Sequence, residues 1–308
     1  MAKPRLLNTH SKKWENYKLF LYVLPCLIFI FIFKYLPLWG WSYAFFQYKP
    51  GRDLFKCAFV GLQNFTALFG NAVMRNNLLR VLRNTFGIQI LNYLLMPVPM
   101  LFAIFLSEIK STKFQKAVQT LTTLPHFISW VIMFSLATSL FGNSGVVNAV
   151  LKNFGAEGIN ILTTDQHVWL IQSLLALWKS LGWSAIIYFA AITGLDQEVY
   201  EAAMVDGASR WQKIRYITIP LLIPTFFVLL IMGIGNFLNS GIDQFLAFGN
   251  AMNKEYIEVL DLYVYNLGIG NGQISFSVAV GMMKSVVAVV LFALANFASK
   301  KIRGTSVF

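Results

Sequence analysis

The sequence predicts an all-α membrane protein, a polytopic bundle of six transmembrane helices. Two features of composition support this class: hydrophobic residues make up 57% of the 308 residues, and charged residues only 12%. The third observation is that the apolar residues gather in six long runs. A helix needs about 20 mostly apolar residues to cross a bilayer, because lipid cannot hydrogen-bond the backbone and each helix must satisfy its own groups.

The N-terminal segment, residues 1–18, is basic, and the first expected span begins at its end and covers residues 17–33. An extension of this span to residue 46 would be broken by Pro37. A cleavable signal peptide is the competing interpretation, but the apolar run is long and no small-x-small cleavage site follows it. The two cysteines, Cys26 and Cys57, fall in this span and in the loop after it, so the sequence predicts neither a disulfide framework nor a metal site.

Five more apolar runs follow, and each is long enough to be a span. A loop at 47–80 precedes the second run, and the weakly amphipathic residues 62–82 predict a helix that lies on the outer surface. Pro97 and Pro99 fall inside the second run and should kink it, as helices in polytopic bundles tolerate. These five expected spans cover residues 85–106, 118–141, 167–192, 221–238 and 275–297.

The segments between the spans are polar, and their charges predict the topology. Six spans place both termini on one side of the membrane. Lys and Arg gather in the segments on that side, which the positive-inside rule assigns to the cytoplasm. The expected organisation is a cytoplasmic N-terminus at 1–18, a transmembrane domain at 19–299 and a cytoplasmic tail at 300–308. The expected loops lie at 108–116, 142–166, 194–220 and 239–274.

The segment 194–220 carries the clearest local signals. Asp196 is a good helix N-cap, and Glu198 follows it in the first turn, where the helix dipole favours negative charge. Gly207 can take the left-handed conformation that stops a helix, and Ser209 with Gln212 forms a capping box that starts another. The pattern predicts a short helix, a glycine turn, a second short helix and a proline-marked entry into the fifth span. An ordinary amphipathic loop on the membrane surface remains the alternative.

The same segment resembles a known signature. Y-E-A-A-M-V-D-G-A-S, followed by I-T-I-P-L-L-I-P, looks like the EAA motif in permease subunits of binding-protein-dependent ABC importers. The chain departs from the motif at Ile219, where the family usually has Leu. F-K-Y-L-P-L-W-G and W-K-S-L-G-W resemble the carbohydrate branch, especially alginate-type permeases for polysaccharide-derived oligosaccharides. The matching residues are Glu201, Ala202, Ala203, Asp206, Gly207, Ala208 and Pro220.

The resemblance implies a function and a set of partners. The chain would form half of a translocation pathway for a sugar in the bacterial cytoplasmic membrane, beside a second, non-identical permease. Two ATPase subunits would bind ATP and magnesium, and an extracytoplasmic solute-binding protein would deliver the cargo. The 196–220 loop would seat in a groove of one ATPase. The residues expected to couple to the ATPase are Glu201, Ala202, Ala203, Asp206, Gly207, Ala208 and Arg210.

Other function classes lack their motifs. The sequence contains no G-x-x-x-x-G-K-[ST], no H-E-x-x-H and no G-x-S-x-G, so we expect no catalytic residue, no metal and no cofactor in this chain. The three histidines, His10, His126 and His167, are scattered, and the basic charge surrounds no nucleic-acid recognition fold. The spans carry almost no acidic residues, which disfavours a proton-coupled carrier. A secondary carrier or channel that acts without an ATPase remains the alternative.

Polar and aromatic residues within the spans are the candidates for cargo contact. Lys179 and Lys284 are costly in a bilayer, at least about 2.5–3.5 kcal/mol each, so each should face a wet cavity or a partner. Trp178 and Trp183 flank Lys179 and suit stacking on sugar rings, and Asn236 and Asn239 should share one helical face. Interhelical packing is the alternative for all six residues. Two intramembrane lysines would suit an acidic sugar such as a uronate. The substrate-binding candidates are therefore Trp178, Lys179, Trp183, Asn236, Asn239 and Lys284.

Overall fold

The computed structural model describes residues 9–162, 164–165 and 167–303. Within these residues the chain is helical, with a single isolated β-bridge between Phe46 and Phe59. Six stretches are long and apolar enough to cross a membrane, which confirms the predicted fold class. They cover Tyr17–Phe45, Ala72–Ser107, Trp130–Asn153, Val168–Thr193, Arg210–Gly235 and Ile274–Phe297. Of the two basic terminal segments, residues 1–8 and 304–308 lie outside the described part.

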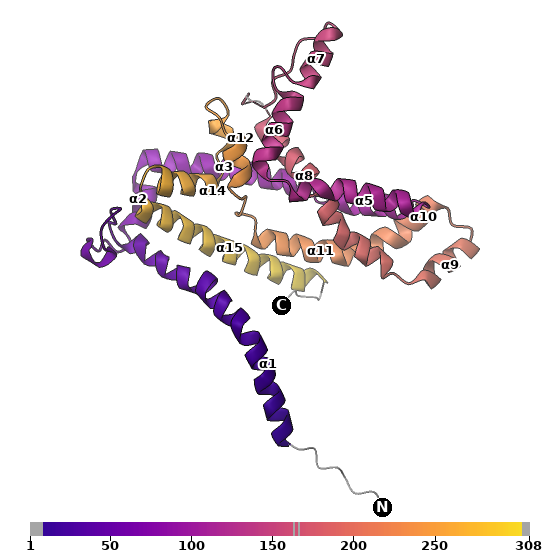
Figure 1. The fold of residues 1–308 in the computed structure, drawn as a ribbon, viewed down its shortest axis with the longest axis horizontal. Coiled ribbons are helices and arrows are strands. Elements are labelled where there is room, and N and C mark those ends of the chain that lie inside the picture. The colour runs from indigo at the N-terminus through magenta and orange to yellow at the C-terminus, as the bar shows by residue number, and fades with distance from the viewer. Residues whose placement is uncertain (1–8, 163, 166, 304–308) are drawn as a thin grey trace, which may run out of the picture.

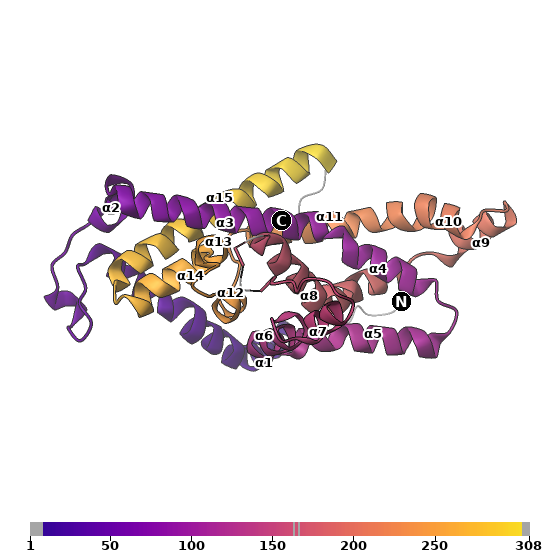
Figure 2. The ribbon, with the colours of Figure 1, turned by 90° about the horizontal axis from the view of Figure 1, so that it is seen from above.

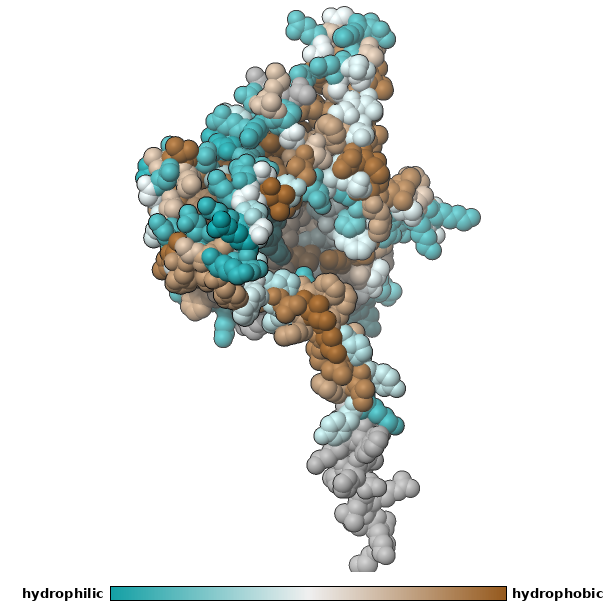
Figure 3. All heavy atoms as spheres, turned by 60° about the vertical axis from the view of Figure 1, so that its left-hand side comes forward, coloured by the Kyte–Doolittle hydropathy of each residue, from teal (hydrophilic) through white to brown (hydrophobic). Residues whose placement is uncertain are grey.

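The first span stands apart from the rest of the bundle. Helix α1 (Thr9–Ile30) projects away from the other helices in Figure 1, and none of its most apolar stretch is buried. Figure 3 shows this arm as a band of hydrophobic surface. The span does not break at Pro37. A π-helical turn at Phe31–Tyr35 and a 3-10 helix at Leu36–Phe45 continue it, with the proline in the first turn of the latter, where its missing N–H costs little.

The second span begins earlier than the sequence predicts. The expected surface helix at 62–82 is instead a short helix α2 (Gln63–Gly70) and the first turns of helix α3 (Ala72–Leu95). Asn71 causes this division, because its side chain accepts hydrogen bonds from the amides of Val73 (2.9 Å) and Met74 (3.3 Å) and caps α3. Helix α4 (Pro97–Ser107) completes the span after the expected proline kink.

The single helix that the sequence predicts at 118–141 is broken, and the third membrane-capable stretch begins only after the break, at Trp130. Helix α5 (Thr112–Phe127) ends just after Pro125, and helix α6 (Trp130–Phe141) starts with Ser129 as its N-cap. The residues between them are extended, and α6 leads into α7 (Val146–Asn153), which points away from the bundle (Figure 1). The proline removes a backbone donor, so the helix is weakest at this point.

Helix α8 (Val168–Thr193) is the centre of the bundle and packs against α3, α4 and α5. At Gly182 a side chain would clash with the backbone of Thr122, so α5 and α8 approach each other backbone to backbone. After a turn come α9 (Gln197–Val205) and α10 (Arg210–Lys213). The sequence predicts that α10 is a short helix separate from the fifth span, but the structure shows that the two are continuous. Helix α10 continues through a π-helical turn into α11 (Ile219–Gly235), and this turn accommodates Pro220.

The expected polar loop at 239–274 is wrong. This segment folds into α12 (Asp243–Phe248), α13 (Lys254–Ile257) and α14 (Leu260–Tyr265), and its apolar residues supply much of the buried core. Helix α15 (Ile274–Arg303) then forms the sixth span, as predicted. Figures 1 and 2 place α9 and α10 at one end of the long axis and α2 at the other.

Candidate functional site

The segment between α8 and α11 has the local structure that the sequence predicts. The Asp196 carboxylate accepts a hydrogen bond from the Glu198 amide at 2.9 Å and caps α9. Gly207 has a φ of +77°, the left-handed conformation that ends the helix. Ser209 and Gln212 form the reciprocal capping box, with bonds of 3.4 and 2.7 Å. A rigid helix–turn–helix therefore protrudes at one end of the bundle (Figure 2).

The surface of this segment is unpartnered within the described chain. Glu201, Ala202, Asp206, Gly207 and Arg210 are exposed, and Ala203 and Ala208 are half-buried. None of the ion pairs among the described residues includes a residue of 196–220. Apolar side chains are exposed beside the charges, and Val205 reaches 88% exposure. A protruding helix with exposed apolar and charged side chains is suited to dock into a groove of another protein.

A hydrogen bond ties α9 to the base of α11. The Tyr200 hydroxyl in α9 and the Thr218 hydroxyl lie 2.9 Å apart, and Thr218 is buried at the base of α11. Helix α10 also continues directly into α11 through the π-helical turn. The segment and the fifth span are therefore joined by continuous helix as well as by this hydrogen bond.

A cavity of about 480 Å³ lies between α3, α4, α8 and α11. Hydroxyl groups of α8 and the Asn92 amide of α3 line it, and Trp183 of α8 presents its indole there. The Trp183 ring stacks on the His126 ring at 4.5 Å with the planes parallel, so its orientation is fixed. The Tyr188 hydroxyl is buried with no hydrogen-bond partner among the described residues. The polar residues of the lining are Asn92, Ser173, Ser180, Trp183, Ser184 and Tyr188.

Trp178 does not share this cavity. It lines a second cavity of about 480 Å³ between α6 and α8, whose walls are almost entirely apolar. The two tryptophans that the sequence groups together therefore face different sides of α8.

Lys179 has three hydrogen-bond partners within the chain. Its ammonium donates to the carbonyls of Pro125 (3.1 Å), His126 (2.7 Å) and Ile128 (2.6 Å), at the break between α5 and α6. It also lies over the Trp130 ring. A cation at the C-terminal end of a helix satisfies carbonyls that have no intrahelical partner. The lysine thus stabilises the broken third span.

The remaining candidates lie together beside α14. Lys284 forms an ion pair with Asp261, whose carboxylate also accepts from the amides of Ser240 (2.8 Å) and Gly241 (3.1 Å). Asn239 lies with this pair around a cavity of about 310 Å³. Asn236 and Asn239 do not share a helical face, because α11 ends at Gly235 and they hydrogen-bond across a turn at 3.2 Å.

A profile of the family described as "Binding-protein-dependent transport system inner membrane component" matches residues 88–304. The chain belongs to this family. It is therefore a membrane-embedded transport component rather than an enzyme, and the family description makes it dependent on a separate binding protein. The segment 196–220, which carries the EAA-like motif, falls inside the matched region.

Individual relatives of this permease are named for the transport of sugar polymers or oligosaccharides. The chain is 40% identical over 285 residues to the polygalacturonan/rhamnogalacturonan transport system permease protein YteP of Bacillus subtilis (strain 168), covering 92% of this chain and 88% of YteP. It is 28% identical over 286 residues to the arabinooligosaccharides transport system permease protein AraP of the same organism, covering 92% of this chain and 87% of AraP.

A solved structure has the same fold. A chain of a bacterial ABC transporter involved in the import of the acidic polysaccharide alginate matches this permease with a TM-score of 0.84 and 32% identity. The match covers 96% of this chain and all of that one. A second crystal structure, of a bacterial alginate ABC transporter in complex with an alginate pentasaccharide-bound periplasmic protein, matches with the same TM-score and 33% identity.

Sequence reasoning missed several residues of the permease cavity. Ser180 and Ser184 lie four residues apart on α8, a spacing that puts them on one helical face and was available as a signal. Asn92 is an amide within a span, three residues after Gln89, to which it donates a hydrogen bond at 3.3 Å, and this pair was a second signal. Asp261 gave none, because its charge placed it in an expected loop and only the fold brings it to Lys284.

Proposed function

We propose that this permease is the transmembrane subunit of an ATP-driven importer for oligosaccharides. The observation that carries the proposal is the protruding segment 196–220, which is exposed, preorganised by caps and tied to α11. Seated on an ATPase subunit, it would transmit closure of that subunit to the spans. Glu201 would pair with a basic residue of the ATPase, and Gly207 would form the elbow of the docking surface.

The cargo cavity is the one between α3, α4, α8 and α11. Trp183 offers a fixed aromatic face to a sugar ring, and the hydroxyls of Ser180 and Ser184 offer hydrogen bonds. The relatives that transport polygalacturonan or arabinooligosaccharides support a sugar polymer fragment as cargo. Asn239 and Lys284 lie in the cavity beside α14 and would contact cargo only after the Asp261 ion pair opens. Trp178 lines an apolar cavity and Lys179 donates hydrogen bonds to backbone carbonyls, so we assign both residues a role in the stability of the fold and not in cargo contact.

A second permease chain completes the pathway. Helix α1 projects from the bundle with its apolar surface uncovered, and a hydrophobic face of this length needs lipid or another protein around it (Figure 3). The cavity lined by this chain is only partly enclosed, as half of a shared pathway would be. We propose a non-identical partner, two ATPase subunits, and a topology with both termini in the cytoplasm, as the basic short loops favour.

Co-purification tests the docking role. The tagged chain is extracted in mild detergent from its native membrane as wild type, as Glu201→Lys and as Glu157→Lys, a control that makes the same charge change outside the segment. We expect an ATPase and a second permease with the wild type and the control, and loss of the ATPase alone from Glu201→Lys. An ATPase retained by Glu201→Lys at the wild-type level contradicts the proposal, as does a chain that purifies alone.

A further inference from the structure

A polar cavity of about 590 Å³ lies at the end of the bundle opposite α9 and α10. The first turns of α3, the segment around α13 and α14, and the start of α15 enclose it. Its apolar floor is formed by Tyr263, Leu267 and Phe276, which are buried. A smaller cavity of about 210 Å³ adjoins it and shares Lys254, Glu258 and Asn266 in its wall.

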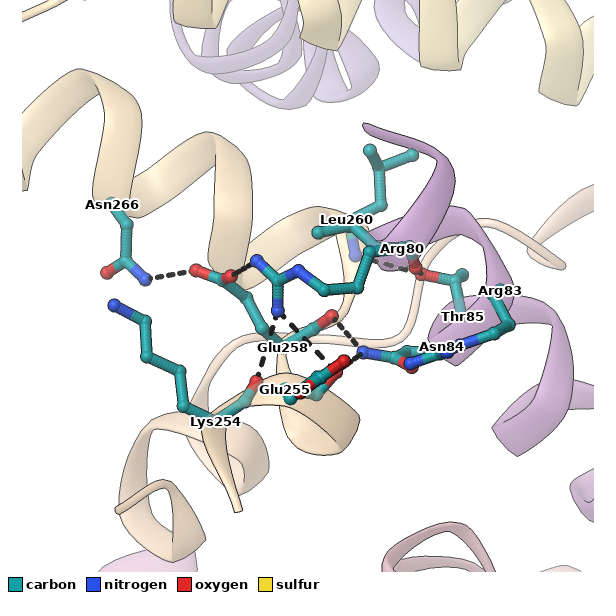
Figure 4. A network of polar contacts seen from close by, with 10 residues as sticks. Arg80, Arg83, Asn84, Thr85, Lys254, Glu255, Glu258, Leu260 and Asn266 are labelled. Carbon is teal, nitrogen blue, oxygen red and sulfur yellow. Dashed lines mark hydrogen bonds and ion pairs between the residues drawn. The ribbon is translucent and has the colours of Figure 1, made fainter. Parts of the chain in front are cut away.

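One wall of the larger cavity is a fixed network, shown in Figure 4. Arg80 of α3 pairs with Glu258 at 2.5 Å, and the Glu258 side chain is only 4% exposed. Asn266 donates to the other Glu258 oxygen at 2.9 Å, and Asn84 donates to the backbone carbonyls of Glu255 (2.7 Å) and Glu258 (3.1 Å). These bonds neutralise the acidic group and hold the wall in one geometry.

The other polar side chains of the lining are available to bind a ligand. Over the described part of the chain, no hydrogen bond or ion pair involves the side chains of Asn77, Lys254, Asn271 or Gln273. The Lys254 backbone carbonyl accepts a hydrogen bond from Arg80, but its ammonium projects beside the network in Figure 4 without a bond to it. With Arg80 and Glu258 cancelling each other, Lys254 gives the cavity one net positive charge. Lys179 and Lys284, by contrast, are both engaged inside the chain.

This combination matches one class of ligand. Amide side chains both donate and accept hydrogen bonds, as neighbouring sugar hydroxyls do, and an ammonium pairs with a carboxylate. The volume falls in the range of about 300–1,000 Å³ that small-molecule sites occupy. We propose that this cavity binds a sugar unit that carries a carboxylate. The carboxylate lies against Lys254, and the ring hydroxyls meet Asn77, Asn271 and Gln273.

This inference rests on the proposed function and extends it. With the coupling segment in the cytoplasm, the cavity opens on the extracytoplasmic side, where cargo arrives. The site therefore selects acidic fragments at the entrance, before they reach the cavity between α3, α8 and α11.

Binding of a charged probe and its neutral counterpart tests the site. The full chain with its co-purifying subunits is placed in lipid nanodiscs, and its affinities for trigalacturonate and for the methyl ester of trigalacturonate are measured. The ester keeps the ring hydroxyls and loses the charges. We compare wild type, Lys254→Gln, Lys254→Arg and Arg75→Gln, which removes one positive charge from α3 outside the cavity lining.

We expect Lys254→Gln to weaken trigalacturonate binding about tenfold, as loss of one charge-assisted hydrogen bond predicts, and to leave the ester unchanged. Lys254→Arg and Arg75→Gln should bind both probes as the wild type does. The double variant Asn77→Ala/Gln273→Ala should weaken both probes alike. The site is wrong if the wild type binds neither probe, if Lys254→Gln changes nothing, or if it weakens both probes equally.

Failure of the site is distinguishable from failure of the importer proposal. The same samples report whether an ATPase co-purifies. An ATPase present without charge-dependent binding refutes this site alone, whereas charge-dependent binding in a sample without any ATPase supports the site and contradicts the coupling role of 196–220.

Discussion

Gly207→Asp separates folding from coupling. Gly207 has a φ of +77°, and an added Cβ there would meet no atom within 4 Å, so the substitution creates no clash. Its cost is the backbone strain of a left-handed residue, about 1–2 kcal/mol and at the lower end for Asp, which tolerates this region. A protein of ordinary stability, about 5–15 kcal/mol, stays more than about 99% folded after that loss. Unfolding would therefore lower uptake by less than about 1%, and any larger fall in uptake must come from a changed docking surface.

Gly155 provides a matched control, because it has a φ of +72°, open space around its Cβ and a place outside the coupling segment. We expect both Gly207→Asp and Gly155→Asp to reach the membrane at wild-type levels. Only Gly207→Asp should lose uptake and the stimulation of ATP hydrolysis by loaded binding protein. Normal uptake by Gly207→Asp would refute the reasoning, and so would an equal loss in Gly155→Asp.

Three further substitutions test the packing. Lys179→Met loses three hydrogen bonds of about 1.5 kcal/mol each and saves about 3 kcal/mol of insertion cost. Thermal denaturation should therefore show that the free energy of unfolding falls by about 1–2 kcal/mol. Lys179→Arg, which keeps the charge and the donors, should show no such fall. Gly182→Ala must push α5 and α8 apart and should cost about 1–3 kcal/mol, whereas Gly281→Ala, with open space around it, should be neutral or stabilising. Asp261→Asn strands the Lys284 cation and should cost about 3–5 kcal/mol, and adding Lys284→Met should recover most of it; equal stability of single and double variants contradicts the pairing.

The features that the sequence predicts correctly depend on residues close together in the chain. The Asp196 cap, the left-handed Gly207 and the Ser209 capping box each follow from rules that span about four residues, and all three are present. The break in the third span is different. Pro125 weakens the helix, but the break is stable because Lys179, on another helix, supplies donors to the freed carbonyls. No local pattern contains that partner.

The same reason explains the error at 239–274. Charged residues such as Glu258 and Asp261 predict an exposed loop, because an unpaired charge is costly to bury. In the fold, Arg80 from α3 and Lys284 from α15 pair with them, and the charges become compatible with a buried segment. Burial of these charged residues therefore depends on partners that are far away in sequence. The charges in 239–274 made the segment look like a loop, so the short helices α12, α13 and α14 were not predicted.

The distribution of charge also bears on how an acidic cargo can pass. A transport pathway needs binding that is favourable enough for entry and weak enough for release. Lys179 of α8 and Lys284 of α15 are both engaged with partners inside the chain and would bind a carboxylate only at the cost of those bonds. The lining of the cavity between α3, α8 and α11 contains no charged residue among those described. A chain that discriminates by charge at Lys254 and conducts through hydroxyls and an aromatic face avoids trapping its cargo midway.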